Sequence, residues 1–98
     1  MNRGLSYHHL ADLELNEAAQ YYDRESSGLG LAFLSAVERC TKEIVEYPEA
    51  SPLLNDVVRR RLVWSFPYGV LYRVTPGEIR ILAIMNLKRR PFYWIGRR

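Results

Sequence analysis

The stretch Phe66-Pro67-Tyr68-Gly69-Val70-Leu71-Tyr72-Arg73-Val74 decides the fold of this chain. Its residues 68–74 are rich in aromatic and β-branched side chains, which favour a strand over a helix. Successive side chains of a strand point to opposite faces, so Tyr68 and Tyr72 share one face while Leu71 and Arg73 share the other. The stretch therefore predicts a strand with a cation on the face opposite its tyrosines.

Two further strands are predicted beside this one. Val57–Trp64 precedes it and Glu78–Asn86 follows it, and both segments have strand-like composition. The connections, residues 65–67 and 75–77, are short, so neighbouring strands should run antiparallel. Pro76 and Gly77 suit the two central positions of a type II turn. In the last strand apolar residues occupy both alternating sets, which indicates a central strand covered on both faces.

The N-terminal half has helical periodicity instead. A short extended segment, Leu5–Leu10, is followed by apolar residues at helical spacing over Ala11–Glu25 and again over Leu29–Glu46. Gly28 suits the left-handed position that ends a helix, and so short a loop predicts an antiparallel helical hairpin. The apolar stripe of the second helix consists of Phe33, Val37, Cys40 and Ile44. Residues 1–98 are thus expected to form one α+β domain: a strand, a helical hairpin, then an antiparallel sheet of three or more strands with the helices on one face.

Charge divides the chain into an acidic and a basic part. Residues 1–56 hold four Lys/Arg and ten Asp/Glu, whereas residues 57–98 hold ten Lys/Arg and one acid, so the parts carry −6 and +9 and the chain +3. The basic part ends in Lys88-Arg89-Arg90-Pro91-Phe92-Tyr93-Trp94-Ile95-Gly96-Arg97-Arg98, where cations stand beside aromatic side chains. This mixture suits nucleic acid or an acidic protein partner, although a solvated basic surface has the same composition.

The composition also limits the chemistry that is expected. A single cysteine, Cys40, cannot form an intrachain disulfide, and its place on the apolar stripe predicts a buried thiol in a cytoplasmic protein. Together with the adjacent His8 and His9 it does not make a zinc-ligand pattern, so no metal and no cofactor is expected. The longest apolar run, Ile81–Met85, is too short to span a membrane, and no signal peptide is expected.

Several segments together resemble one protein family. In chain order they are Glu14–Tyr22, Gly28–Gly30, Phe33-Leu34, Pro48, Pro52, Arg59-Arg60, Phe66–Tyr68, Tyr72–Val74, Ile81–Ala83, Arg90-Pro91 and Tyr93-Trp94. In this order and spacing they resemble the toxins of bacterial type II toxin–antitoxin modules, the ParE/RelE superfamily, and most closely its ParE-like, plasmid-stabilisation branch. The fold of that superfamily agrees with the fold predicted above.

The resemblance implies a growth-inhibiting toxin that is neutralised by a cognate antitoxin. Antitoxins of this kind wrap an extended, partly disordered segment over the toxin, and a basic, aromatic-rich strand face is a suitable receptor for it. Operator DNA is then expected to bind only through the antitoxin. The residues expected to contact the antitoxin are Arg60, Leu62, Trp64 and Arg73.

The superfamily has two activities, and the resemblance implies a different site for each. ParE-like members bind DNA gyrase and trap its cleaved-DNA state without bond chemistry of their own. RelE-like members cut messenger RNA on the ribosome, for which Arg73, Arg89 and Tyr93 would stabilise the phosphorane and move protons. The residues expected to contact gyrase are Arg89, Arg90, Tyr93, Trp94, Arg97 and Arg98.

Two departures from the family pattern bear on this choice. Gly69 stands where the nucleases often carry a basic residue, which favours the gyrase poison over the nuclease. Asn86 stands where many ParE-like proteins carry a histidine, and it cannot titrate near neutral pH. Together the two departures leave open a third possibility, a non-toxic member that only binds an antitoxin.

Structural roles are open alternatives for the same residues. Tyr93 and Trp94 could pack the C-terminal segment onto the sheet, and Arg73 could pair with a helix carboxylate such as Glu17 or Glu43. If the C-terminal segment contacts the target, deletion of residues 89–98 is expected to abolish toxicity and to leave a folded domain.

Overall fold

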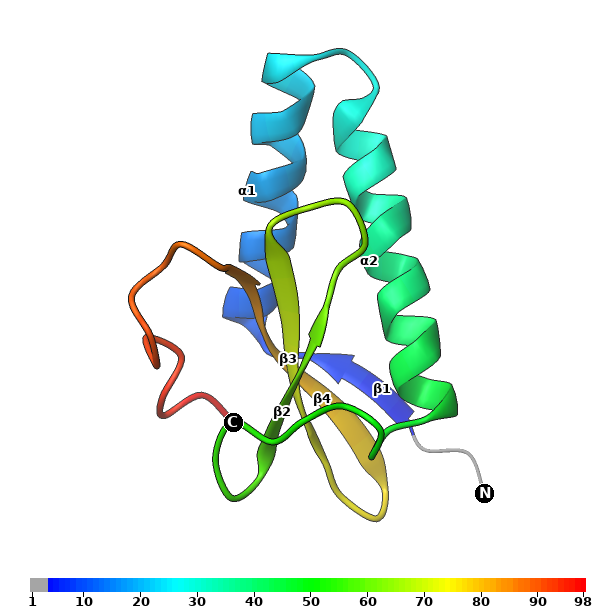
Figure 1. Cartoon of the computed structure of the whole chain (residues 1–98), viewed down its shortest axis with the longest axis vertical. Helices are drawn as coiled ribbons and strands as arrows, with labels where there is room; N and C mark the ends of the chain where they lie inside the picture. The colour runs from blue at the N-terminus through cyan, green and yellow to red at the C-terminus, as the bar shows by residue number, and fades with distance from the viewer. Residues whose placement is uncertain (1–3) are drawn as a thin grey trace.

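A helical hairpin covers one face of a four-stranded sheet (Figure 1). The computed structural model describes residues 4–98. The elements, in chain order, are β1 (Gly4–Tyr7), α1 (His9–Glu25), α2 (Leu29–Glu46), β2 (Val58–Leu62), β3 (Tyr68–Val74) and β4 (Glu78–Asn86). The bounds of α2, β3 and β4 are those predicted, and Gly28 has the expected left-handed conformation, with φ of 87°.

The strands lie in the order β1-β4-β3-β2. β2, β3 and β4 pair antiparallel as predicted, with Tyr72 of β3 opposite Arg59 on one side and Ile81 on the other. β1 pairs with β4 in parallel, from Gly4 beside Glu78 onward, so the sheet is mixed rather than purely antiparallel. The sequence could not fix the direction of β1, because the hairpin and two strands separate it from β4.

Two predicted boundaries are wrong by a few residues. The extended segment ends at Tyr7 rather than Leu10, because His8 caps the first helix and its Nδ1 accepts the backbone N–H of Leu10 at 3.1 Å. His9 therefore belongs to α1, and the two histidine rings stack with centroids 4.5 Å apart. β2 is also shorter than predicted at both ends and stops at Leu62.

The turn between β3 and β4 differs from the prediction. Gly77 does not have the positive φ that a type II turn requires. Instead the backbone N–H of Thr75 donates to the Glu78 carbonyl at 2.9 Å, and the Glu78 N–H donates to Thr75 Oγ1 at 3.2 Å. A threonine hydroxyl thus closes the turn without the special glycine conformation.

The hydrophobic core has two layers, one on each face of the sheet. The larger layer packs the hairpin against β3 and β4, and the predicted stripe of α2 is buried in it. The smaller layer, on the opposite face, joins Leu71 and Leu82 to Trp94 near the C-terminus. β4 is therefore central and covered on both faces, as predicted.

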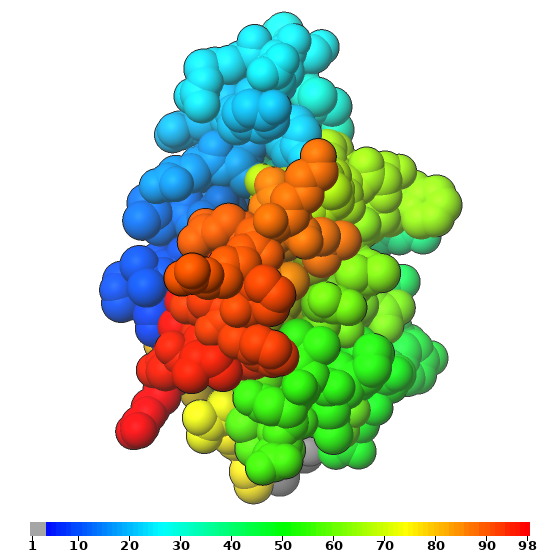
Figure 2. Space-filling model, turned by 60° about the vertical axis from the view of Figure 1, so that its left-hand side comes forward, coloured from blue at the N-terminus to red at the C-terminus, as the bar shows by residue number. Residues whose placement is uncertain are grey.

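The C-terminal segment, residues 87–98, covers the second face of the sheet and is called the tail below. It contains turns but neither helix nor strand. The N–H of Ile95 donates to the Phe92 carbonyl at 3.0 Å, and the N–H of Arg97 donates to the Trp94 carbonyl at 3.1 Å. Figure 2 shows the tail, in orange and red, lying between the start of α1 and the segment that leads into β2.

Candidate functional site

One carboxylate of α1, that of Glu14, fixes the tail. Its Oε2 accepts the Tyr93 hydroxyl at 2.7 Å and Arg97 Nη2 at 3.1 Å. Its Oε1 accepts Arg97 Nη1 at 2.9 Å and the Ile84 N–H at 3.0 Å. The side chains of Glu14 and Arg97 are only 16% and 12% exposed. A shielded, two-point ion pair of this kind is stronger than an ordinary surface pair.

The ring of Tyr93 contacts two guanidinium groups. The Cζ atom of Arg89 lies 4.1 Å from the ring centroid and that of Arg97 lies 5.0 Å away, which are cation–π distances. Burial, and then the hydrogen bond to the Glu14 carboxylate, raise the pKa of Tyr93 well above its ordinary value. Tyr93 therefore keeps its proton at neutral pH, which makes it a poor general acid or base there.

The six residues predicted to contact the target differ in their exposure to solvent. Trp94 is buried in the second core layer, while Tyr93 and Arg97 are tied to Glu14. The tail packing that was the structural alternative for Tyr93 and Trp94 is therefore present. The three residues that remain exposed are Arg89, Arg90 and Arg98.

Sequence reasoning gave no role to Phe92, Ile95 or Glu14. Phe92 is 54% exposed and Ile95 60% exposed beside the arginines of the tail. Phe92 also has φ of 63°, a conformation that is costly for a non-glycine residue and is enriched at functional sites. A signal for Glu14 existed, because it lies between the buried Ala11 and Ala18 on one side of α1, where a carboxylate needs a partner.

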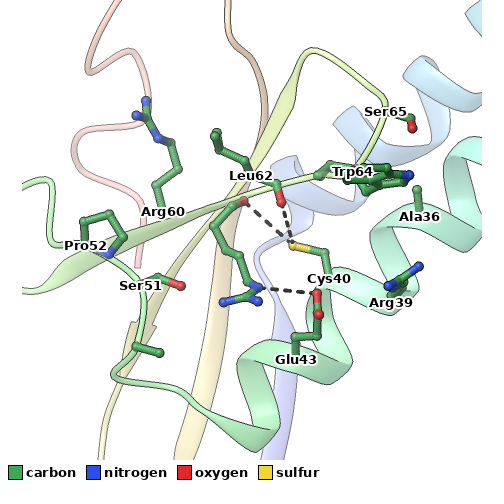
Figure 3. A pocket seen from close by; sticks show the side chains of 13 residues that line it. Ala36, Arg39, Cys40, Glu43, Ser51, Pro52, Arg60, Leu62, Trp64 and Ser65 are labelled. Atoms are coloured by element: carbon green, nitrogen blue, oxygen red, sulfur yellow. Dashed lines mark hydrogen bonds and ion pairs between the residues drawn. The ribbon is translucent and has the colours of Figure 1, made fainter.

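A groove of about 640 Å³ lies between α2 and β2 (Figure 3). Three of the four residues predicted to contact the antitoxin, Arg60, Leu62 and Trp64, line it. Leu62 is 59% exposed and Trp64 75% exposed, and Arg39 adds a further cation. The side chains of Arg60 and Leu62 point away from α2 (Figure 3), onto the face of the sheet that carries Leu71. The groove itself therefore combines the exposed ring of Trp64 with the positive charge of Arg39.

The groove borders an open edge of the sheet. β2 is the outer strand, and the loop before it covers only its first half: Arg60 N–H donates to the Pro52 carbonyl at 3.1 Å and Leu54 N–H to the Val58 carbonyl at 2.7 Å. Outward-facing backbone groups alternate along a strand, so the N–H of Leu62 faces the same side, beyond this loop, while the Leu62 carbonyl faces the Cys40 thiol at 3.8 Å. An edge of this kind can pair with an extended peptide.

Cys40 closes the floor of the groove. Its thiol lies 3.8 Å from the backbone oxygens of Arg61 and Leu62, and Arg61 Nε lies 3.5 Å from the Glu43 carboxylate. Burial raises the pKa of Cys40 to about 11, so the thiol is protonated at neutral pH and is not a ready nucleophile. Within residues 4–98, no three side chains of metal-ligating type gather to hold an ion.

Arg73 lies apart from the groove. It lines a hollow of about 240 Å³ beside the tail, together with Trp94 and Arg98. Arg73 alternates with Leu71, which faces away from the hairpin, and it pairs with neither Glu17 nor Glu43. Arg89 lines another hollow, beside α1. The structure therefore does not bring Arg73 and Arg89 into one pocket.

Comparison with known proteins identifies the fold. No family model and no curated protein sequence matches this chain. A solved structure described as the chromosomal ParDE TA system from P. aeruginosa is similar, with a TM-score of 0.65 and 20% sequence identity over 86% of this chain and 95% of that chain. The chain thus has the ParE/RelE-like α+β fold that the resemblance implied. Among residues 4–98, no helix has both the length and the apolar character needed to cross a bilayer.

Proposed function

We propose that this chain is the toxin of a bacterial type II toxin–antitoxin module and that a cognate antitoxin holds it inactive in the cytoplasm. Its growth inhibition would follow from ParE-like binding to DNA gyrase. The observation that carries the proposal is the structural similarity, which extends over nearly the whole length of a chain from a ParDE system. Operator DNA would be bound through the antitoxin rather than by this chain.

The groove supports the antitoxin part of the proposal. An extended antitoxin segment could pair with the edge at Leu62, place apolar side chains against Trp64 in the groove, and set carboxylates against Arg60 on the opposite face of β2. Arg73 shares the face of Arg60 but lies in a separate hollow beside the tail, so an antitoxin that reaches it must extend along that face.

The state of the tail supports binding over bond cleavage. A ribonuclease needs a proton donor and acceptor beside the scissile phosphate. The Tyr93 hydroxyl already donates its hydrogen bond to Glu14, and Arg97 is paired with the same carboxylate. The exposed arginines of the tail are left for contact with a target.

A ribosome-dependent messenger RNA endonuclease is the second candidate, and one observation favours it. A Cβ atom at Gly69 would lie 3.0 Å from Cγ of Arg60, so the Arg60 side chain lies over the position where the nucleases often carry a basic residue. Arg60 lies opposite Leu71 on β3 and Arg73 lies opposite Val58, so both arginines belong to the same face of the sheet, where they could stabilise a phosphate.

Pulse-labelling of DNA and protein synthesis, directly after induction of this chain alone in bacteria, tests the choice. We expect DNA synthesis to fall first, with a DNA-damage response, and co-expression of the antitoxin to prevent both. An earlier fall in translation would overturn the gyrase target in favour of the nuclease. Accumulation of folded protein with neither process affected would identify a member that only binds antitoxin.

A further inference from the structure

Glu14 occupies the point where three parts of the chain meet. β1 pairs with β4 only as far as Ile81, so within residues 4–98 the edge of β4 beyond Ile81 lacks a partner strand. Glu14 accepts the N–H of Ile84 at this edge, and Arg97 Nη1 donates to the Leu82 carbonyl at 3.0 Å. The Glu14–Arg97 pair thus satisfies backbone groups that would otherwise need a strand or water.

The same carboxylate controls the path of the tail. Tyr93 and Arg97, which bind it, lie on either side of the buried Trp94 and hold the tail at three neighbouring points. The segments between and before these points project outward, with Phe92 and Ile95 more than half exposed. The positive φ of Phe92 is costly for a non-glycine residue and needs surrounding contacts to hold it.

We propose that Glu14 is a positioning residue, which latches the tail onto α1 and thereby presents Arg90, Phe92 and Ile95 as one contact surface. The surface fits a protein face that carries carboxylates and apolar side chains, since exposed apolar groups flanked by arginines match such a face better than a bare phosphate backbone. The role in target contact rests on the function proposed above, whereas the latch itself does not.

Glu14→Gln tests the latch with little change in side-chain size. The amide has one acceptor oxygen and no charge, so it cannot bind Tyr93, Arg97 and Ile84 as the carboxylate does. The matched control is Glu17→Gln, which removes an exposed carboxylate one turn later on the same helix. Tyr93→Phe is a milder variant that keeps the ring and the Glu14–Arg97 pair.

Hydrogen exchange at the Ile95 and Arg97 amides of the isolated chain is the direct measurement. We expect exchange in Glu14→Gln to be faster on the order of tenfold or more, with a smaller increase in Tyr93→Phe and none in Glu17→Gln. The amides of α2 should keep wild-type exchange, which separates release of the tail from general unfolding. Unchanged exchange at Ile95 and Arg97, or equal acceleration throughout the protein, would overturn the latch.

Growth arrest and antitoxin binding complete the test. We expect Glu14→Gln to weaken growth arrest while it binds antitoxin as the wild type does, because the groove does not include the tail. A loosened tail with full growth arrest would overturn the positioning role. If the wild-type chain itself fails to arrest growth, the proposed function falls, and the exchange experiment still decides the latch.

Discussion

Glu14 and Arg97 are 83 positions apart, yet they form the most shielded ion pair among the described residues. Because the two residues lie so far apart in the chain, no local spacing in the sequence indicates that they pair. Only the carboxylate on the buried side of α1 signals that a partner is needed. At the scale of single residues, the sequence therefore predicted which side chains line the sheet but not which of them form ion pairs or hydrogen bonds with one another.

Gly30 allows the two helices to approach closely, and its replacement should be costly. A Cβ atom there would collide with the backbone oxygen of Ala19 in α1 and with the side chain of Asp23, whose carboxylate accepts the Gly30 N–H at 2.7 Å. We expect Gly30→Ala to lower the free energy of unfolding by about 1–3 kcal/mol in urea titrations. Gly77→Ala is the control, because its Cβ would meet no atom within 4 Å, and equal stability of the two variants would contradict the prediction.

His8 should make the stability of the fold depend on pH. Burial, followed by the neighbouring His9, Arg97 and Arg80, lowers the pKa of His8 below its ordinary value of about 6.5. The unfolded state then binds the proton more readily than the folded state. The contribution of neutral His8 to the free energy of unfolding is therefore complete above pH ~6.5, and it is lost as the pH falls through the lower pKa of the folded state. Protonation of Nδ1 would also remove the acceptor for the Leu10 N–H.

The comparison with His8→Asn isolates this effect, since asparagine can cap a helix but does not titrate. Urea unfolding of both proteins from pH 8 to pH 5 is the measurement. We expect the wild type to lose stability relative to His8→Asn across that range. A difference between the two proteins that stays constant with pH would contradict the prediction.

At the scale of elements, periodicity predicted α2, β3 and β4 to the residue, because strong stripes and short turns specify them. It was less accurate for β1, where a histidine cap moved the helix start, and for β2, whose edge position gives a weak pattern. The groove could not be predicted from any one segment, because it depends on how α2 and β2 sit together. Arg60, Leu62 and Trp64 were predicted as antitoxin contacts because the family resemblance implied a basic, aromatic-rich receptor, and that role stays a prediction.

Trp64 should contribute to antitoxin binding but not to folding. Its side chain is 75% exposed at the groove, so Trp64→Ala should change the free energy of unfolding by no more than about 0.5 kcal/mol. We expect the same variant to weaken binding of a cognate antitoxin by roughly 30-fold, in the range of an interface hot spot. Calorimetric titration measures the affinity.

Leu31→Ala is the matched control for Trp64→Ala. Leu31 is 68% exposed, at the start of α2, and does not line the groove. Its replacement should leave antitoxin affinity unchanged. Equal losses of affinity in the two variants would remove the groove as the site of contact.

At the scale of the whole molecule, the acidic residues gather in the first half of the chain, where the helical hairpin lies, and the basic residues in the second half, which forms most of the sheet and the tail. Such a separation of charge orients an acidic partner toward the basic side before contact. It also explains why the sequence pointed to the tail as a binding surface. The sequence did not show that residues 87–98, which form this surface, also bury Trp94 in the second core layer.

This shared use changes what deletion of residues 89–98 can show. The deletion removes Trp94, which is only 3% exposed. It also removes Tyr93 and Arg97, the partners of Glu14. Loss of a buried tryptophan alone costs about 3–5 kcal/mol, a large part of the stability of a small domain. We therefore expect the truncated chain to be strongly destabilised rather than cleanly folded, as thermal unfolding would measure.

Arg90→Glu separates contact from folding where the deletion cannot. Arg90 is exposed in the tail, so reversal of its charge should leave the thermal midpoint unchanged and should weaken growth arrest through repulsion from an acidic target surface. Arg24→Glu, an exposed reversal of the same charge near the end of α1, controls for the change in net charge. Full growth arrest by Arg90→Glu, with Arg24→Glu behaving alike, would mean that the target is contacted elsewhere on the molecule.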